Sequence, residues 1–259
     1  MMNKRGQVTV FVIVGIVIVV TIALVFYFLG DNIKRETDTE VVFDESSLEP
    51  LQDYVEDCIE KHGGEAIDLV LKGGGDIEPG LHQMYHNEKI NFLCYTDGYN
   101  ACYNKMPFLD SHIEEQINNY VLERLNTCID FSAIESEGFE IQKGNMDLKT
   151  SVGKYNILIT LDYPVTLSKG DSKIIEDRFS KTFDVPLGRI LKVVNDIVEF
   201  DSDPNGFPIL PFDVVAYAYR TNGEAEIKMD SIEDSKIYKV NLRDSPYVFQ
   251  FANKRWVRP

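Results

Sequence analysis

Apolar residues recur every three or four positions in two long stretches of this chain, which is the spacing of an amphipathic helix. The first stripe runs from Leu48 to Ile59, resumes at Ile67 and stops before Gly73-Gly74-Gly75. We expect Gly63-Gly64 to interrupt this helix and the three glycines to end it. A second helix is predicted from Asp110 to about Ile129.

After residue 132 the spacing of apolar residues changes toward two, which is typical of half-buried strands. A third helix is predicted within this region, from Val185 to Phe200, with Pro186 in its first turn. The pattern predicts an α+β fold with two or three helices and an antiparallel β-sheet. Strands are predicted at 139–142, 155–167, 173–183 and 237–242, with turns at 168–171 and 221–223.

An uncharged, strongly apolar segment from Val8 to Leu29 precedes these elements. A helix of that length would span about 33 Å, against about 30 Å for the hydrocarbon core of a bilayer. It is longer than the apolar core of an ordinary secretory signal peptide, so we interpret it as a single transmembrane helix. Lys4 and Arg5 precede it, which favours a cytoplasmic N-terminus and an extracellular C-terminal domain at the cell membrane.

The sequence Lys4-Arg5-Gly6-Gln7 before this segment resembles the class III signal sequence of archaeal type IV pilins. The resemblance implies cleavage between Gly6 and Gln7 and self-assembly through the freed helix, which would pack in the core of a filament. Many pilins carry Glu five residues after the cut, where this chain has Phe11. The Gly30-Asp31-Asn32 sequence is typical of a helix end, which makes anchoring in the lipid bilayer the firmer expectation.

The chain is therefore expected to have five parts: a cytoplasmic n-region, a transmembrane helix, an acidic stalk, a helical subdomain braced by disulfides, and a β-rich subdomain. The cysteine-bearing first helix, its Gly-Gly sequence and the closing strand 246–252 resemble membrane-anchored surface proteins of small-genome archaea. That resemblance implies location and architecture, but no activity. The five parts are residues 1–7, 8–29, 30–47, 48–131 and 132–259.

The charge balance of the chain excludes one class of partner. It has 26 Lys and Arg residues against 42 Asp and Glu, a formal net charge of −16. Its basic residues cluster only in pairs, such as Lys34-Arg35 and Lys254-Arg255. Nucleic-acid binding requires a concentrated basic surface, so we expect no nucleic-acid partner.

Four cysteines, Cys58, Cys94, Cys102 and Cys128, lie on the side of the chain that is expected to be extracellular, where disulfides form. Three pairings are possible. We favour Cys58 with Cys128, because both lie on the apolar stripes of helices that should pack together, and Cys94 with Cys102 across a short loop. The alternative is a zinc site made by four thiolates, although the chain has no Cys-x-x-Cys pair.

His82 and His86 stand four residues apart and would share a metal if they lay on a helix. They follow Pro79-Gly80, and Gln83 occupies the position where a zinc protease needs its catalytic Glu. We therefore favour a solvated loop.

Asp201, Asp203 and Asn205 place oxygen donors at alternate positions before Gly206, as in the first half of a calcium loop. The bidentate Glu of such a loop is missing, since Phe212 stands in its place. A β-turn uses the same residue types and is the favoured interpretation, with calcium as the alternative cofactor.

Tyr95, Tyr99 and Tyr103 recur around the loop between Cys94 and Cys102. Tyrosine gives a large contact area at small entropic cost, so these residues would suit a surface that binds sugar or protein. Burial within the loop is the favoured alternative.

No catalytic motif accompanies these features: the chain has no Gly-x-Ser-x-Gly, no phosphate-binding loop and no dinucleotide fingerprint. The sequence therefore predicts a non-enzymatic, single-pass membrane protein of the archaeal cell surface with a structural, adhesive or pilus-like assembly role. The alternative is an anchored extracellular enzyme or a metal-dependent binding module.

Overall fold

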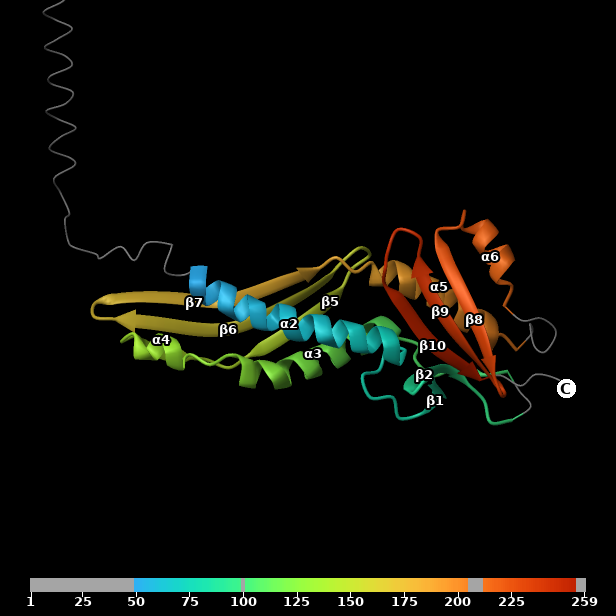
Figure 1. The fold of residues 1–259 in the computed structure, drawn as a ribbon, viewed down its shortest axis with the longest axis horizontal. Helices are drawn as coiled ribbons and strands as arrows, with labels where there is room; N and C mark the ends of the chain where they lie inside the picture. The colour runs from blue at the N-terminus through green and yellow to red at the C-terminus, as the bar shows by residue number, and fades with distance from the viewer. Residues whose placement is uncertain (1–48, 99–100, 205–211, 255–259) are drawn as a thin grey trace, which may run out of the picture. The chain divides into compact units, whose positions relative to one another are not determined.

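The structure is a computed structural model that describes residues 49–98, 101–204 and 212–254. Apart from the first residue of β7, its helices and strands belong to one unit that comprises Glu45–Lys169 and Lys173–Pro259. The fold is α+β, as predicted (Figure 1). In chain order the elements are α2 (Glu49–Gly73), β1 (His82–Tyr85), β2 (Glu88–Tyr95), β3 (Tyr103–Asn104), α3 (Leu109–Cys128), α4 (Ser132–Ser136), β4 (Glu140–Lys143), β5 (Asp147–Val152), β6 (Ile157–Lys169), β7 (Ser172–Phe183), α5 (Leu187–Ser202), α6 (Val214–Arg220), β8 (Ala225–Ile232), β9 (Ser235–Leu242) and β10 (Val248–Lys254).

The predicted helices are present as α2, α3 and α5, with ends within a few residues of those expected. The glycine run ends α2 as predicted: Gly74 and Gly75 have φ angles of 73° and 92°, and the Gly75 N–H donates to the carbonyl of Val70 at 2.8 Å. This bond satisfies one of the carbonyls that a helix end leaves open, and the positive φ angles explain why glycine occupies both positions.

The expected interruption of α2 at Gly63-Gly64 is wrong, because the helix continues through both residues. Gly63 lies where α2 crosses the sheet of β6 and β7. A Cβ atom at this position would lie 2.6 Å from Cζ of Phe183 and 2.8 Å from Cδ1 of Ile159. The glycine therefore permits close helix–sheet packing instead of breaking the helix.

One sheet has four strands, with β6 at its centre. β4 and β5 pair antiparallel with successive parts of β6 on one edge, and β7 pairs with the other edge. Residues alternate between buried and more exposed along β6, where Ile157, Ile159 and Leu161 are fully buried. The buried face packs against α2 and α3, which lie across this sheet in Figure 1.

The other sheet has the order β1-β2-β10-β9-β8, with β3 paired to β2. The predicted antiparallel sheet is only partly correct here, because β2 and β10 are parallel whereas the remaining pairs are antiparallel. β2 comes from the segment expected to be a helical subdomain, 48–131, and β10 comes from the segment expected to be β-rich, 132–259. The two segments therefore share one sheet, which α5 covers on one face.

No helix within residues 49–98, 101–204 and 212–254 is long and apolar enough to cross a membrane. The segment Val8 to Leu29, the cleavage position between Gly6 and Gln7 and the stalk at 30–47 lie outside the described residues.

The contact at Gly63 predicts opposite effects for two neighbouring substitutions in α2. Gly63→Ala should lower the free energy of unfolding by about 1–3 kcal/mol, because the new methyl group would overlap Phe183 and Ile159. Gly64→Ala is the control: its Cβ would be 4.0 Å from the nearest ring atom, and alanine should raise helix stability by up to about 1 kcal/mol. Urea unfolding followed by circular dichroism measures both. Equal effects at the two positions would contradict close packing at Gly63.

Candidate functional site

All four cysteines form disulfides, in the pairing favoured from the sequence. Cys58 of α2 is bonded to Cys128 at the end of α3, with their Cα atoms 6.0 Å apart. Cys94 in β2 is bonded to Cys102, just before β3, and the Cα atoms are 5.3 Å apart. The cysteines therefore brace the fold, and none of them is available as a thiolate ligand for zinc.

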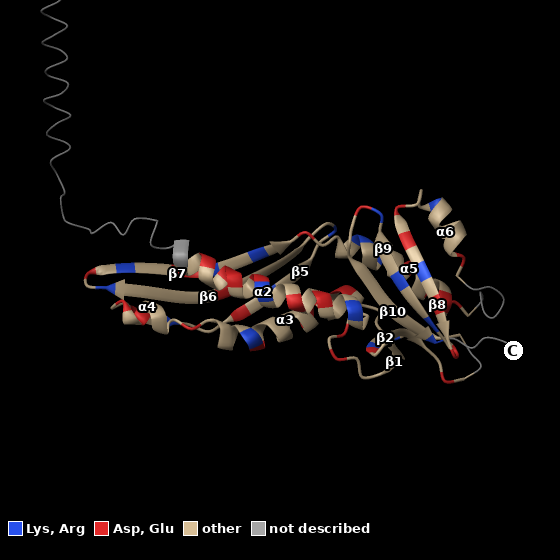
Figure 2. Ribbon diagram, in the orientation of Figure 1, with Lys and Arg blue, Asp and Glu red and all other residues tan. Residues whose placement is uncertain are grey.

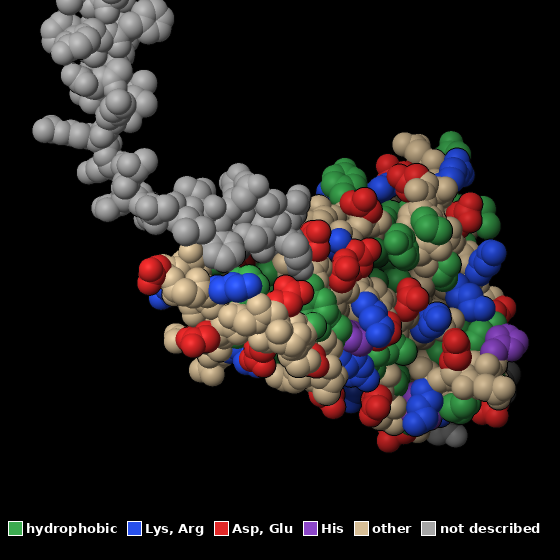
Figure 3. All heavy atoms as spheres, turned by 60° about the vertical axis from the view of Figure 1, so that its left-hand side comes forward, with side chains coloured by type: hydrophobic (Ala, Val, Ile, Leu, Met, Phe, Trp, Pro, Cys, Tyr) green, Lys and Arg blue, Asp and Glu red, His purple; other side chains and the backbone are tan. Residues whose placement is uncertain are grey.

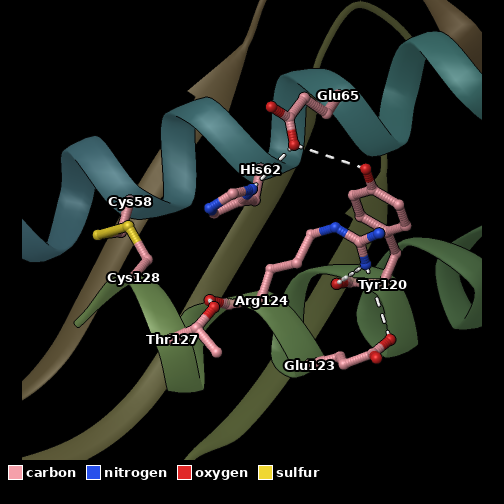
Figure 4. Close-up of polar contacts among 8 residues, drawn as sticks. All are labelled: Cys58, His62, Glu65, Tyr120, Glu123, Arg124, Thr127 and Cys128. Carbon is pink, nitrogen blue, oxygen red and sulfur yellow. Dashed lines mark hydrogen bonds and ion pairs between the residues drawn. A yellow bond between two sulfur atoms is a disulfide. The ribbon is translucent and has the colours of Figure 1, made fainter. Parts of the chain in front are cut away.

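Polar contacts beside the first disulfide also join α2 to α3 (Figure 4). His62 Nδ1 lies 2.9 Å from Oε2 of Glu65, and the Tyr120 hydroxyl donates to the same oxygen at 3.5 Å. The hydrogen bond with His62 lowers the pKa of Glu65 below its ordinary value. The Arg124 guanidinium lies 3.3 Å from the centroid of the Tyr120 ring. Of these contacts, the hydrogen bond between Tyr120 and Glu65 crosses from α3 to α2. Together with the Cys58–Cys128 disulfide it links the two helices, and we call this group of contacts the clamp between α2 and α3.

A second cluster of polar groups is buried beneath the Cys94–Cys102 disulfide. The carboxylate of Asp201, which is 2% exposed, accepts hydrogen bonds from the Tyr238 hydroxyl at 3.0 Å and from Nδ2 of Asn253 at 2.8 Å. The side-chain oxygen of Asn253 accepts from the N–H of Cys94 at 3.1 Å. The network thus ties the end of α5 to β9, β10 and the disulfide loop.

This network changes the interpretation of the candidate calcium residues. Asp201 belongs to α5, and its carboxylate serves the network inside the fold. Asp203 follows the helix and is exposed, whereas Asn205 lies outside the described residues. Among the residues that the structure describes, no group of three His, Cys, Asp or Glu side chains is placed to hold a metal ion.

The two histidines occupy a β-hairpin, whereas a loop was the favoured interpretation. His82 begins β1, and its Nδ1 lies 3.1 Å from the carbonyl oxygens of Pro79 and Gly80. His86 lies in the tight turn after β1, where its φ angle is 48°, and its ring packs edge-on against Tyr85. Each imidazole thus has its own local contacts.

The tyrosines of the disulfide loop have different environments. Tyr95 packs against Phe92 at a centroid distance of 5.1 Å, and Nζ of Lys254 lies 5.6 Å from its ring centroid. Tyr103 is 68% exposed in β3, and Tyr99 lies outside the described residues. The contact surface suggested by their spacing is therefore described only at its two ends.

A pocket of about 490 Å³ lies beside the first turns of α5, and we call it the α5 pocket. Its volume falls within the roughly 300–1,000 Å³ range of ligand-binding clefts. Two helices and three connecting segments contribute charged or aromatic groups to it. These are Lys154 and Tyr155 from the β5–β6 turn, Arg189, Lys192 and Asp196 from α5, Tyr217 from α6, Glu224 before β8, and Asp244 after β9.

Several of these groups are already paired. Arg189 donates to Asp244 at 3.1 Å and lies 4.0 Å from a carboxylate oxygen of Glu224. This arginine lowers the pKa of Asp244 below its ordinary value. The Tyr217 hydroxyl donates to Asp196 at 2.7 Å, and burial, reinforced by this bond, raises the pKa of the phenol well above its usual range. Tyr217 and Asp196 are therefore hydrogen-bonded to each other in the lining of the pocket.

Two ammonium groups in the α5 pocket have no carboxylate partner within the described ranges: those of Lys154 and Lys192. No motif in the sequence marks Lys154 or Lys192 as a binding residue. Arg189, Lys192 and Asp196 stand three and four residues apart within the predicted third helix, so a polar face could have been read from the pattern. Lys154 and Asp244 come from distant turns, and only the fold brings them there.

No family model, curated protein or solved structure matches this chain. The chemistry of its sites therefore has to be inferred from its own residues.

The buried network predicts that Asp201 is important for stability. Asp201→Ala should lower the free energy of unfolding by about 2 kcal/mol, because the buried hydrogen bonds that Tyr238 and Asn253 donate to its carboxylate would be lost. Glu199→Ala, an exposed position on the same helix, should change it by less than about 0.5 kcal/mol. Chemical denaturation of both variants tests this difference. A small effect at Asp201 would mean that the network does not stabilise the fold.

Proposed function

We propose that this protein is a non-enzymatic, membrane-anchored protein of the cell surface, with a disulfide-braced extracellular body that has a structural or adhesive role. The observation that carries the proposal is that all four cysteines are paired in two disulfides. Such bonds persist in oxidising surroundings and are rare in the cytosol.

The positions of the disulfides support an extracellular body. One joins two helices across 70 residues, and the other closes a loop of 8. Crosslinks of this kind stabilise a fold by restricting its unfolded chain, by about 4 kcal/mol for a loop as long as the first. Since both bonds brace secondary structure, the body would lose stability in a reducing compartment.

The proposed anchor is the apolar segment Val8 to Leu29, with the N-terminus in the cytoplasm and the C-terminal domain outside. If Gly6-Gln7 is cut as in pilins, the same helix would serve self-assembly into a filament. The high negative charge of −16 would keep neighbouring bodies apart and soluble.

The charged surface of the body is compatible with contact with water and with other molecules. Acidic residues are spread along α2 (Figure 2), and acidic and basic side chains are interspersed over the face drawn in Figure 3. The clamp between α2 and α3 and the Asp201 network hold the body in one shape. A rigid body of this kind fits a role in which it presents surfaces to other molecules.

The proposed location predicts the state of the cysteines in intact cells. A thiol reagent that cannot cross membranes should leave the protein unlabelled without reductant and label four cysteines after denaturation and reduction. The protein should also sediment with the membrane fraction. A soluble cytosolic protein with four thiols open to alkylation would refute both the location and the role.

The proposed processing predicts the mature N-terminus. Mass spectrometry of the protein from cells should find Gln7 as the first residue if a prepilin peptidase acts after Gly6. A Gly6→Val variant, which removes the small residue at the cut, should keep its first six residues and is the control. An intact Met1 or Met2 in the native protein would exclude the filament role and leave the anchored role in place.

A further inference from the structure

We propose that the α5 pocket binds an anionic carbohydrate, namely a glycan that contains hexuronic acid residues. This inference rests on the proposed adhesive role, because it names the class of molecule to which the protein would adhere. It is argued from the charges that remain unpaired in the pocket, from its exposed aromatic ring and from the rigidity of its walls.

The unpaired charges favour an anion. Of the basic groups in the pocket, Arg189 is occupied by Asp244 and Glu224, but Lys154 and Lys192 have no such partner within the described residues. A chain with a net charge of −16 repels anions in general. Two ammonium groups that line one pocket and have no carboxylate partner within the described residues therefore provide a local place where a carboxylate can bind.

The aromatic ring favours a ligand that also has an apolar face. Tyr155 is 59% exposed beside these lysines. Nζ of Lys154 lies 5.1 Å and Cζ of Arg189 lies 5.6 Å from its ring centroid. These cation–ring contacts hold the ring in place, and an exposed tyrosine offers both an apolar surface and a hydroxyl. A sugar ring, with C–H groups on one face and hydroxyls at its edge, matches this combination.

The carboxylates of the pocket favour a sugar over an acidic peptide as the ligand. Asp196, Glu224 and Asp244 line the pocket together with the three basic residues. Each carboxylate has more lone pairs than the contacts described above use, so it can still accept hydrogen bonds. Sugar hydroxyls donate such bonds, whereas the many carboxylates of an acidic peptide would be repelled. The lining therefore suits a ligand with one acid group and several hydroxyls on each ring.

The turn that carries Lys154 and Tyr155 is fixed to the helix that carries Lys192. The N–H of Gly188, the second residue of α5, donates to the carbonyl of Gly153 at 3.1 Å, and Gly153 N–H donates to the carbonyl of Asn156 at 2.8 Å. A Cβ at Gly188 would lie 2.7 Å from the Gly153 oxygen, so glycine permits this approach. The backbone segments that carry the two lysines are thus joined before any ligand arrives, which lowers the entropic cost of binding.

The test is calorimetric titration of the purified full-length protein in detergent. The probes are short oligosaccharides of galacturonic acid and of glucuronic acid. The methyl ester of each, which is neutral but otherwise similar, is titrated as the control. We expect one of the two acids to bind, and its ester to bind at least about tenfold more weakly, because the ester cannot pair with the lysines. Binding should weaken as salt is added.

Variants locate the binding site. Lys154→Gln and Lys192→Gln should each weaken binding about fivefold to tenfold, and Tyr155→Ala should weaken it by a similar factor. Lys173→Gln, which removes an exposed charge from β7, is the matched control and should leave the affinity unchanged. Circular dichroism of each variant shows whether the fold is retained.

Three results would overturn the inference: equal binding of acid and ester, unchanged affinity when both lysines are replaced, or no binding of either acid at millimolar concentration. Binding of a poly-glutamate peptide in place of both sugars would also overturn it. None of these results depends on where the protein resides, and the cysteine-labelling experiment does not depend on sugar. Failure of the pocket and failure of the proposed location can therefore be told apart.

Discussion

The close packing of α2 is the constraint on which the rest of the structure depends. At Gly63 the helix approaches Phe183 and Ile159 so closely that no side chain fits between. In its first half it is bonded to α3 through Cys58 and Cys128, and at its end the carbonyl of Lys72 accepts a hydrogen bond from Gln250 of β10 at 2.9 Å. One helix thus contacts both sheets and the neighbouring helix. Displacing it would open the core on several sides at once.

The helices and several strands could be predicted because their signals are local. A stripe of apolar residues every three or four positions defines α2, α3 and α5, and alternation defines β6. The parallel pairing of β2 with β10 could not be predicted, because it joins segments that are far apart in the sequence. The local pattern of apolar residues does not indicate which strand pairs with which. The Gly63-Gly64 pair in α2 was misleading for a related reason, since Gly63 packs against Ile159 and Phe183 of a sheet that comes much later in the sequence.

The candidate sites show the same limit. The cysteine pairing could be argued from the sequence, because both Cys58 and Cys128 continue apolar stripes that must face each other. The oxygen donors of Asp201 and Asp203 suggested a metal, but Asp201 is turned inward to Tyr238 and Asn253, which no spacing rule reveals. The α5 pocket is assembled from distant turns, so its chemistry becomes visible only once the chain is folded.

The parallel pairing of β2 with β10 also sets an order for the nascent chain. Cys58 and Cys128 both precede Val248 in the chain, so their disulfide can close before β10 is available to pair with β2. The β2 edge then stays open until the last strand arrives, which is a state in which unpaired strands are prone to aggregate. If the disulfide closes at that stage, it ties α2 to α3 during that interval. A disulfide closed in that order would serve the folding of the chain as well as the stability of the finished fold.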